Sequence, residues 1–400
     1  MYFKKNPFNV VPPKEVDFWA DRKKPRIEIE HLAKTFPKNP SNQIRAIWGP
    51  WGNGKSHALG YLKFLFKHHN PKVNFIGGAF PKDATTFTKL YKQQFITSYS
   101  IENFGQTCKK LFKDCGELES QEDEKKLREV GEDLWDSSFD FTGIVLTTGQ
   151  IFSDKKNLIE AINDERFRLV RQWFNGVRLA KQQLYEIKVD RNLQSDSDFI
   201  NIMTYLIRLS NSEYGGKRPV VWALDDCHVM RKPNMQLKHI NQIQQGIRTL
   251  FDQTTTGLLI ILSLAATERG KVKDLLIPDL QSRLSPDTIS ILQFDSEKLD
   301  DAILFVEELI SHPNFKDTKQ SKSKYFPFDK ESTIKTALEK VRDLEDDFTP
   351  RRIMEHFANL QNHDTRIVQD GWNEDYINRH FTKLEKEKRD QEKEETEDHD

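Results

Sequence analysis

A glycine-rich run at residues 49–56 has the residue types and spacing of a phosphate-binding loop. It reads Gly-Pro-Trp-Gly-Asn-Gly-Lys-Ser, which is a full GxxxxGK[ST] pattern. Glycines at this spacing let successive backbone N–H groups turn inward around a diphosphate, and a following helix adds its positive N-terminal end. We expect Lys55 to reach the β- and γ-phosphate oxygens of ATP and Ser56 to offer its hydroxyl to Mg²⁺. The alternative is a glycine turn that arose by chance.

The flanking residues supply the structural context that such a loop needs. Residues Gln43–Trp48 predict a short buried strand before the loop, and Ala58, Leu62, Leu65 and Phe66 recur at helical spacing after it. The predicted nucleotide-binding residues are Gly49, Pro50, Trp51, Gly52, Asn53, Gly54, Lys55, Ser56 and His57.

Two neighbouring carboxylates follow a second apolar stretch. Residues 219–226 read Pro-Val-Val-Trp-Ala-Leu-Asp-Asp, so the pair Asp225 and Asp226 ends a predicted strand. Asp225 is placed to support a Mg²⁺ ion beside Ser56, and Asp226 to orient or deprotonate the attacking water. Most ATPases of this kind have Glu at the second position, and Asp is one methylene shorter, so we expect slow hydrolysis or a water-bridged geometry. The alternative is an acidic pair that only ends a strand.

Composition limits the classes of protein to consider. The chain has 400 residues, enough for two or three domains, and 36% of them are hydrophobic, enough for a core. Its 61 basic residues are balanced by 62 acidic ones, so DNA contact requires a local patch. The cluster Arg22-Lys-Lys-Pro-Arg26 is one candidate, and a solvated loop is the alternative.

Several features favour a cytoplasmic protein. The three cysteines, Cys108, Cys115 and Cys227, are too few for a disulfide framework and lack zinc-ligand spacing. The N-terminus has no apolar run typical of a signal peptide. The longest apolar run, Leu258–Ala266, is about half as long as a membrane-spanning helix.

The pattern along the chain predicts an α/β fold with a parallel sheet flanked by helices. Five apolar segments read as strands: Gln43–Trp48, Val73–Phe80, Pro219–Leu224, Gly257–Leu264 and Ile289–Phe294. Helical patterns separate them, and only helical patterns follow the last one. The sequence therefore predicts a parallel α/β domain with an all-α domain at its C-terminal end.

These residues resemble the AAA+ class of P-loop NTPases, and within it the replication initiators of archaea and eukaryotes (origin-recognition and Cdc-type loaders). The strand at Leu258–Leu264 leads to Thr267 at the place of the family's sensor-1 residue, with Ser263 as the alternative. The run Leu280-Gln-Ser-Arg283-Leu resembles the element whose arginine reaches the γ-phosphate in a neighbouring subunit. An ordinary surface arginine is the alternative for Arg283.

A further likeness concerns a helical lid. The run Phe348-Thr-Pro-Arg-Arg-Ile predicts a helix with Thr349 as N-cap and Pro350 at its first position. It resembles the sensor-2 element of the family, in which Arg351 would approach the γ-phosphate, with Arg352 as the alternative. The resemblance also implies that Asn6-Pro-Phe and Phe18–Arg22 belong to an adenine-side segment.

A narrower resemblance points to ATP-binding proteins of prokaryotic phage-defence (BREX-type) systems. It rests on residues 171–176, Arg-Gln-Trp-Phe-Asn-Gly, and on the extended loop sequence GPWGNGKSHALGYL. The alternative is ordinary helical packing by Trp173 and Phe174.

The chain departs from the initiators in two ways. Lys55 and Asp225 are 170 residues apart, which predicts a large helical insertion at about 101–210. Little sequence follows Leu360, so the winged-helix DNA-binding domain of the initiators is not expected. The predicted organisation is an N-terminal adenine-side segment at 1–40, an AAA+ domain at 41–295, a helical lid at 296–380, and a charged, disordered tail at 381–400.

The leading functional hypothesis is an ATPase that uses Mg²⁺ and ATP in a homo- or hetero-oligomer. It would hydrolyse ATP to ADP and phosphate, slowly or when stimulated by a partner, and would assemble or remodel DNA or a DNA-bound protein complex, in replication or phage defence. The alternative is an ATP-gated switch that hydrolyses slowly and binds a protein partner through its helical insertion. A small-molecule kinase is disfavoured by the length of the chain.

Overall fold

A computed structural model gives the fold of the chain. It describes residues 7–8, 16–20, 22–118, 120–227, 236–295, 297–313, 315, 324–345, 348–363 and 371–397. The chain forms two compact units. The lid unit consists of Met1–Ile29, Gly49–Phe64 and Ser290–Asp400, and the sheet unit consists of Glu30–Trp48 and Leu65–Ile289. The predicted domain boundaries stay a prediction.

A five-stranded sheet has the strand order β2-β3-β4-β1-β5. Its strands are β1 (Gln43–Gly49), β2 (Asn74–Ala79), β3 (Val220–Asp225), β4 (Leu258–Ala265) and β5 (Ile289–Ser290). The β2–β3 and β3–β4 pairs are parallel, with Asn74 opposite Val220 and Val220 opposite Leu258. The predicted parallel α/β fold is confirmed. The apolar runs of β3 and β4 are buried almost throughout, as expected for central strands covered on both faces.

The fifth strand is shorter than predicted. The chain leaves the sheet after Ser290, so the predicted continuation to Phe294 is wrong. The apolar pattern that suggested it has another cause, because Phe294 packs against Phe305 and Phe348 in the core of the lid unit.

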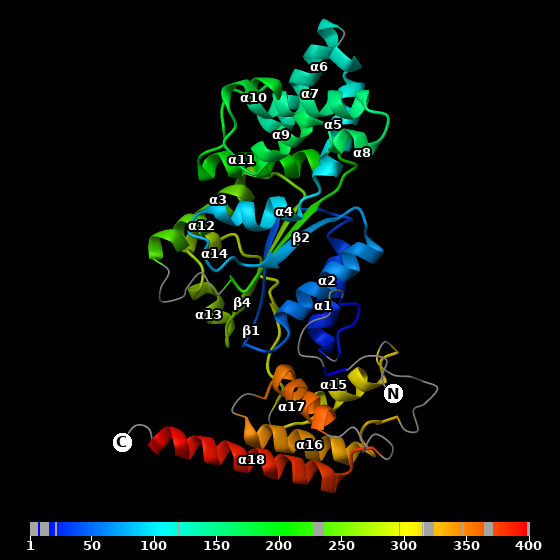
Figure 1. Cartoon of the computed structure of the whole chain (residues 1–400), viewed down its shortest axis with the longest axis vertical. Coiled ribbons are helices and arrows are strands. Elements are labelled where there is room, and N and C mark those ends of the chain that lie inside the picture. The colour runs from blue at the N-terminus through cyan, green and yellow to red at the C-terminus, as the bar shows by residue number, and fades with distance from the viewer. Residues whose placement is uncertain are drawn as a thin grey trace. The chain divides into compact units, whose positions relative to one another are not determined.

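Helices account for the rest of the sheet unit (Figure 1). Between β2 and β3 lie α3 (Phe87–Leu90), the π-helix η1 (Tyr91–Phe95), α4 (Ile96–Ser98), α5 (Ile101–Asp114), the 3₁₀ helix η2 (Gly116–Leu118), α6 (Gln121–Trp135), α7 (Phe139–Asp154), α8 (Leu158–Ile162), α9 (Glu165–Phe174), α10 (Lys181–Glu186) and α11 (Asp196–Asn211). After β3 follow α12 (Leu237–Gln253), α13 (Arg269–Asp274) and α14 (Pro278–Gln281). Two helices, α1 (Lys23–Thr35) and α2 (Lys55–His69), run from one unit into the other.

The predicted helical insertion is present and has a continuous aromatic core. Trp135, Phe141, Trp173 and Phe174 are all buried in it, and the Trp135 Nε1–H donates to the Thr142 hydroxyl at 2.7 Å. Side-chain N-caps start most of its longer helices, so the local sequence fixes where each one begins. The insertion is therefore an ordered domain that the chain builds between two neighbouring strands.

The π-helix between α3 and α4 places one buried amide against the sheet. Gln94 donates from Nε2 to the Gly78 carbonyl at 2.6 Å and accepts at Oε1 from Trp222 Nε1–H at 3.0 Å. Its side chain is 3% exposed. Gln94 thus joins the end of β2, an edge strand, to an indole in the middle of β3.

The lid unit is helical apart from its share of the sheet strands. Its C-terminal part contains α15 (Asp300–Ser311), α16 (Glu331–Leu344), α17 (Pro350–His363) and α18 (Glu374–Glu397). Ile334, Leu338, Ile353 and Phe357 are fully buried among them. The predicted all-α region is confirmed. The charged tail departs from the prediction of disorder, because residues 381–397 continue α18.

The sequence also led to expectations about the cysteines and about the hydropathy of the helices. Cys108, Cys115 and Cys227 are free thiols and all are buried. Among the residues described, no helix has both the length and the apolar character needed to cross a membrane.

The buried amide gives a testable prediction of stability. We expect Gln94→Leu to destabilise the protein by about 1–3 kcal/mol in urea unfolding, because the Trp222 N–H loses its partner inside the core. Within the described part of the chain, the side chain of the exposed neighbour Gln93 hydrogen-bonds only to the Asp83 carboxylate. Gln93→Leu should therefore change stability by less than about 0.5 kcal/mol. Equal effects of the two substitutions would contradict this role of Gln94.

Candidate functional site

The glycine-rich run forms a tight loop between β1 and α2. Gly52 and Gly54 have φ angles of 76° and 92°, which favour glycine over residues with a side chain. At Gly49 an added Cβ would lie 1.9 Å from the Ile291 carbonyl oxygen. The helix begins at Lys55, so its first N–H groups belong to the end of the loop. Gly49 thus lets the loop pack against Ile291, and Gly52 and Gly54 supply the left-handed turns of the loop.

The lysine of the loop is held against it. Lys55 is 7% exposed, and its Nζ donates to the carbonyls of Gly49 at 2.9 Å and Pro50 at 2.8 Å. The same ammonium lies 5.8 Å from the centre of the exposed Trp51 ring. The positive charge is therefore fixed at the loop and not dispersed in solvent.

Asn53 provides a test of whether the loop suits a polar ligand. Its side chain is 1% exposed, and neither Oδ1 nor Nδ2 has a hydrogen-bond partner among the described residues. A buried amide without partners costs free energy unless a ligand or water satisfies it. Together with the left-handed Gly52 and Gly54, this amide fits a loop that closes around phosphate oxygens.

The start of α17 lies against the loop within the lid unit. Thr349 accepts a hydrogen bond from the Arg352 N–H at 3.3 Å, so the predicted N-cap, with Pro350 as the first helical residue, is confirmed. A Cβ on Gly52 would lie 3.0 Å from the Thr349 hydroxyl and 3.3 Å from the Cβ of Arg351. Of the two arginines proposed as sensor 2, Arg351 therefore has its Cβ beside the loop.

Both arginines also form ion pairs on the helix. Arg351 pairs with Glu355 at 3.1 Å and is 61% exposed. Arg352 pairs with Glu345 at 3.3 Å and with Glu355 at 3.0 Å. Glu355 thus shares its carboxylate between the two arginines, which limits how far either guanidinium moves.

His57, whose predicted role in cofactor binding stays a prediction, contacts the N-terminal segment. Its Nε2 lies 2.8 Å from the Phe18 carbonyl oxygen. Burial lowers the pKa of His57, while the Phe18 carbonyl and the nearby Asp17 carboxylate raise it in part. Nearby, Val16 packs on Gly60 of the same helix. Residues 16–20 of the predicted adenine-side segment therefore lie along α2, whereas Asn6 lies outside the described residues.

The acidic pair lies at the end of β3 in the sheet unit. The Asp226 N–H donates to Asp225 Oδ1 at 2.9 Å, and Asp226 has a φ of 55°. Asp is one of the few residues that adopt this left-handed backbone readily. The next residue, Cys227, is buried, and burial together with the Asp225 charge raises the pKa of its thiol. The backbone therefore turns sharply after Asp225.

The structure places Ser263, not Thr267, beside this pair. Leu224 of β3 pairs with Leu262 of β4, and the next residues along these parallel strands are Asp225 and Ser263. The Ser263 side chain is fully buried, and its hydroxyl has no partner among the described residues. Thr267 lies beyond the strand, is exposed, and accepts from Lys271 at 3.1 Å. Ser263, the alternative sensor-1 candidate, thus has the better position.

No ready-made metal site is present in the part of the chain that the structure describes. No group of three or more His, Cys, Asp or Glu side chains there is arranged to hold an ion. The predicted Mg²⁺ ligands, Ser56 and Asp225, belong to different units. Mg²⁺ is commonly held by one or two protein oxygens, phosphate oxygens and water, so this donor set is of the expected kind.

Arg283 forms an ion pair in the sheet unit. Its Nε lies 2.8 Å from Asp252 Oδ1, and this contact raises the pKa of the guanidinium. Arg248 also pairs with Asp252, at 2.9 Å. The side chain of Arg283 is 37% exposed, so the guanidinium is at the surface but already has a carboxylate partner.

The basic cluster near the N-terminus is partly neutralised. Arg22 lies over the Phe294 ring at 4.1 Å. Arg26 donates to the Trp19 carbonyl at 3.0 Å and pairs with Glu308 at 3.3 Å. Half of the four cations of this cluster therefore serve contacts inside the lid unit, which weakens the case for DNA contact there.

Packing explains the residues that suggested a phage-defence protein. Trp173 and Phe174 are buried, and the Trp173 Nε1–H donates to the Arg191 carbonyl at 2.9 Å. Gly176 has a φ of 63° just after α9, where glycine commonly ends a helix. The phage-defence resemblance stays a prediction.

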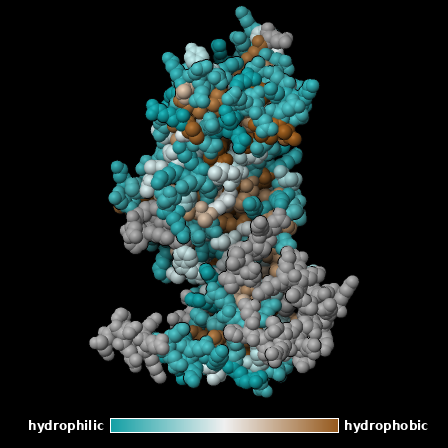
Figure 2. All heavy atoms as spheres, viewed as in Figure 1, coloured by the Kyte–Doolittle hydropathy of each residue, from teal (hydrophilic) through white to brown (hydrophobic). Residues whose placement is uncertain are grey.

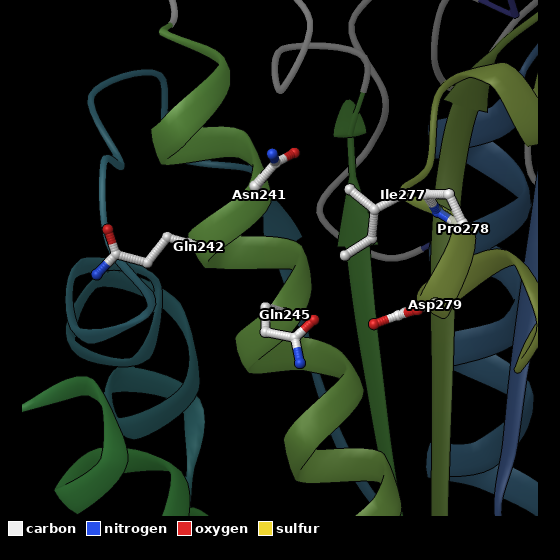
Figure 3. Close-up of a pocket in the computed structure, with 6 residues that line it drawn as sticks. All are labelled: Asn241, Gln242, Gln245, Ile277, Pro278 and Asp279. Carbon is white, nitrogen blue, oxygen red and sulfur yellow. The ribbon is translucent and has the colours of Figure 1, made fainter.

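An open surface pocket of about 510 Å³ lies between α12 and the start of α14 (Figure 3). It is lined by Asn241, Gln242, Gln245, Ile277, Pro278 and Asp279. None of the predicted site residues lines it, and its Asp279 already pairs with Arg248 at 3.6 Å. It does lie close to one of those residues, since the pKa of Arg283 is raised first by Asp252 and in smaller part by the charge of Asp279.

Comparison with known proteins gives weak structural likenesses. No protein-family model matches the chain, and no curated protein matches its sequence. The chain is similar to the ORC2 protein of Aeropyrum pernix, with 9% identity and a TM-score of 0.47 over 96% of this chain and 72% of that chain. It is also similar to the ORC1 protein of Aeropyrum pernix in complex with DNA, with 12% identity and a TM-score of 0.47 over 96% of this chain and 70% of that chain.

A Walker-type ATPase of Pyrococcus abyssi, paby2304, has 15% identity and a TM-score of 0.41 over 98% of this chain and 79% of that chain. Identities and TM-scores this low assign no family, so a function for this chain has to rest on its own residues.

Proposed function

We propose that the chain is an ATPase that binds Mg²⁺–ATP at residues 49–56. The observation that carries this proposal is the loop itself. It combines two left-handed glycines, an anchored Lys55 and a buried Asn53 whose side chain has no partner among the described residues. Backbone N–H groups at the start of α2 would bind phosphate oxygens, Lys55 would contact the β- and γ-phosphates, and Ser56 would bind the metal ion.

The sheet unit would supply the residues for hydrolysis. Asp225 would support the metal ion through water or directly, and Asp226 would orient or deprotonate the attacking water. The buried hydroxyl of Ser263 beside Asp225 is the better candidate for the polar residue that senses the γ-phosphate. When bound, Mg²⁺ would neutralise charge that develops on the phosphate oxygens.

The contact between Gly52 and α17 suggests how nucleotide binding would be coupled to movement. Any change in the loop around Gly52 would act directly on the Thr349 cap and on Arg351. Arg351 would approach the γ-phosphate from this helix. Nucleotide state would then bias the position of α17, which is the kind of coupling an ATPase needs to remodel a partner or its own assembly.

The proposals about the assembly, the target and the biological role rest on the family resemblances. A homo- or hetero-oligomer with Arg283 acting in trans, a DNA-associated target and a role in phage defence are proposals that the AAA+ and BREX-type likenesses suggest. The slowly hydrolysing switch is distinguished from the ATPase by turnover, since brisk ATP hydrolysis stimulated by DNA would exclude it.

The loop gives the first test. We expect Lys55→Ala to weaken binding of Mg²⁺–ATP by roughly 10- to 100-fold in calorimetric titration, because charge-assisted contacts to phosphate are lost. The melting temperature without ATP should change little. Lys63→Ala, on the exposed side of the same helix, is the matched control and should bind as the parent does. Unchanged affinity in Lys55→Ala would refute the proposed site.

The acidic pair gives the second test. We expect Asp226→Asn to retain ATP binding and to lower the rate of phosphate release by about 100-fold or more, because the general base is lost. Asn tolerates the φ of 55°, so this substitution removes the charge without straining the turn. Asp274→Asn, an exposed residue of α13, serves as the control. Unchanged turnover in Asp226→Asn would remove Asp226 from the mechanism.

The third test separates a catalytic Arg283 from a structural one. A trans-acting arginine predicts that Arg283→Ala lowers ATP hydrolysis about 10-fold or more and abolishes ATP-dependent assembly in native mass spectrometry. Asp252→Ala removes the same ion pair but leaves the arginine, so it should retain both properties. If the two variants behave alike, Arg283 only anchors α12.

A further inference from the structure

The segment of residues 166–189 in the helical insertion concentrates positive charge. It contains six basic residues and one acidic residue, Glu186, in a chain whose total charge is −1. The basic residues are Arg166, Arg168, Arg171, Arg178, Lys181 and Lys188. A local excess of this size is an electrostatic feature that the balanced composition of the whole chain conceals.

Most of these cations are available to a partner. Arg166 and Arg168 pair with acids at the start of α9. The other four, Arg171, Arg178, Lys181 and Lys188, are exposed. None of those four forms an ion pair with another residue in the described part of the chain. We call them the cationic segment.

An exposed aromatic ring lies in the same stretch of sequence as these charges. Tyr185 is 78% exposed, the highest value among the large exposed hydrophobic side chains of the described residues. It follows Lys181 by four residues on α10, so the two side chains lie on the same side of the helix. Leu184 and Ile187 are buried and hold the opposite side of this stretch against the core. Among the described residues, the Tyr185 ring makes no aromatic contact and its hydroxyl forms no hydrogen bond.

The backbone that carries the cationic segment is fixed by specific contacts. Asn192 accepts from the Leu179 N–H at 2.8 Å and donates to the Leu179 carbonyl at 3.0 Å. Lys92 donates to the Gly176 carbonyl at 3.3 Å and lies over the Phe199 ring. The cations and the ring are therefore presented from a framework that needs little ordering when a ligand binds.

The exposed cations and the exposed ring of the segment favour one class of ligand over others. On the face seen in Figure 2, the helical insertion is mostly hydrophilic, with scattered apolar side chains. Exposed cations and an exposed tyrosine in one segment match a phosphate backbone whose bases can stack on the ring. A paired base in a duplex cannot stack on a lone surface ring without being flipped out. An acidic peptide would use the charges but not the ring.

We propose that the cationic segment binds single-stranded nucleic acid. Arg171, Arg178 and Lys181 contact phosphates, and a base stacks on Tyr185. This site goes beyond the proposed ATPase function and is independent of residues 49–56, so each can fail without the other.

Fluorescence anisotropy of the full chain without ATP tests the proposal, with a labelled oligothymidine of about 20 nucleotides as the probe. The triple variant Arg171→Gln, Arg178→Gln, Lys181→Gln should raise Kd at least 10-fold. The dependence of log Kd on log salt concentration should fall in slope by about two, since three phosphate contacts are lost. Tyr185→Ala should weaken binding about 5-fold or more, and Tyr185→Phe should restore it.

The control removes three other exposed charges of the same insertion, Lys113→Gln, Arg128→Gln and Lys125→Gln, and should bind as the parent does. Lys55→Ala should also bind the oligonucleotide normally, which separates this site from the ATP site. Equal binding by the triple variant and its control overturns the proposal. So does equal binding of duplex DNA with no effect of Tyr185→Ala, or displacement of the strand by polyglutamate at equal charge concentration.

Discussion

The absence of a side chain at Gly52 is the constraint on which the lid unit most depends. This residue has a left-handed backbone, and a Cβ on it would lie in tight contact with Thr349 at 3.0 Å and Arg351 at 3.3 Å. Thr349 also caps α17 through the Arg352 N–H. The shape of the glycine-rich loop and the start of a helix almost 300 residues later in the chain are therefore set by one close contact.

In the sheet unit, the buried strand β3 positions the acidic pair. The apolar residues of β3 fix its position between β2 and β4, so the chain can turn sharply at Asp226 without moving Asp225. An aspartate tolerates that turn better than a glutamate would, since its short side chain can bond locally to the backbone. The presence of Asp in place of Glu at position 226 therefore has a conformational reason, in addition to the slow hydrolysis that it predicts. The buried Ser263 hydroxyl adds a polar group to a strand that is otherwise apolar.

The sequence was informative wherever a local rule determines structure. Four of the five strands could be located from runs of apolar residues, and the start of α17 from Thr349 and Pro350, because burial and capping act over a few residues. Features that depend on distant partners could not be located in this way. The contact of His57 with Phe18, the position of Ser263 beside Asp225 and the departure of Phe294 from the sheet all follow from packing between remote segments. The charged C-terminal segment was misjudged because composition alone does not show that α18 packs on α16.

The burial of all three cysteines has a practical consequence for spectroscopy. Thiol reagents react with accessible thiolates, and burial raises the pKa of both Cys108 and Cys227. The native thiols therefore give little background labelling, and a single cysteine introduced at an exposed position such as Ile159 could carry a dye without removal of the natural ones. The helical insertion can thus be observed by fluorescence in a chain that keeps its three natural cysteines.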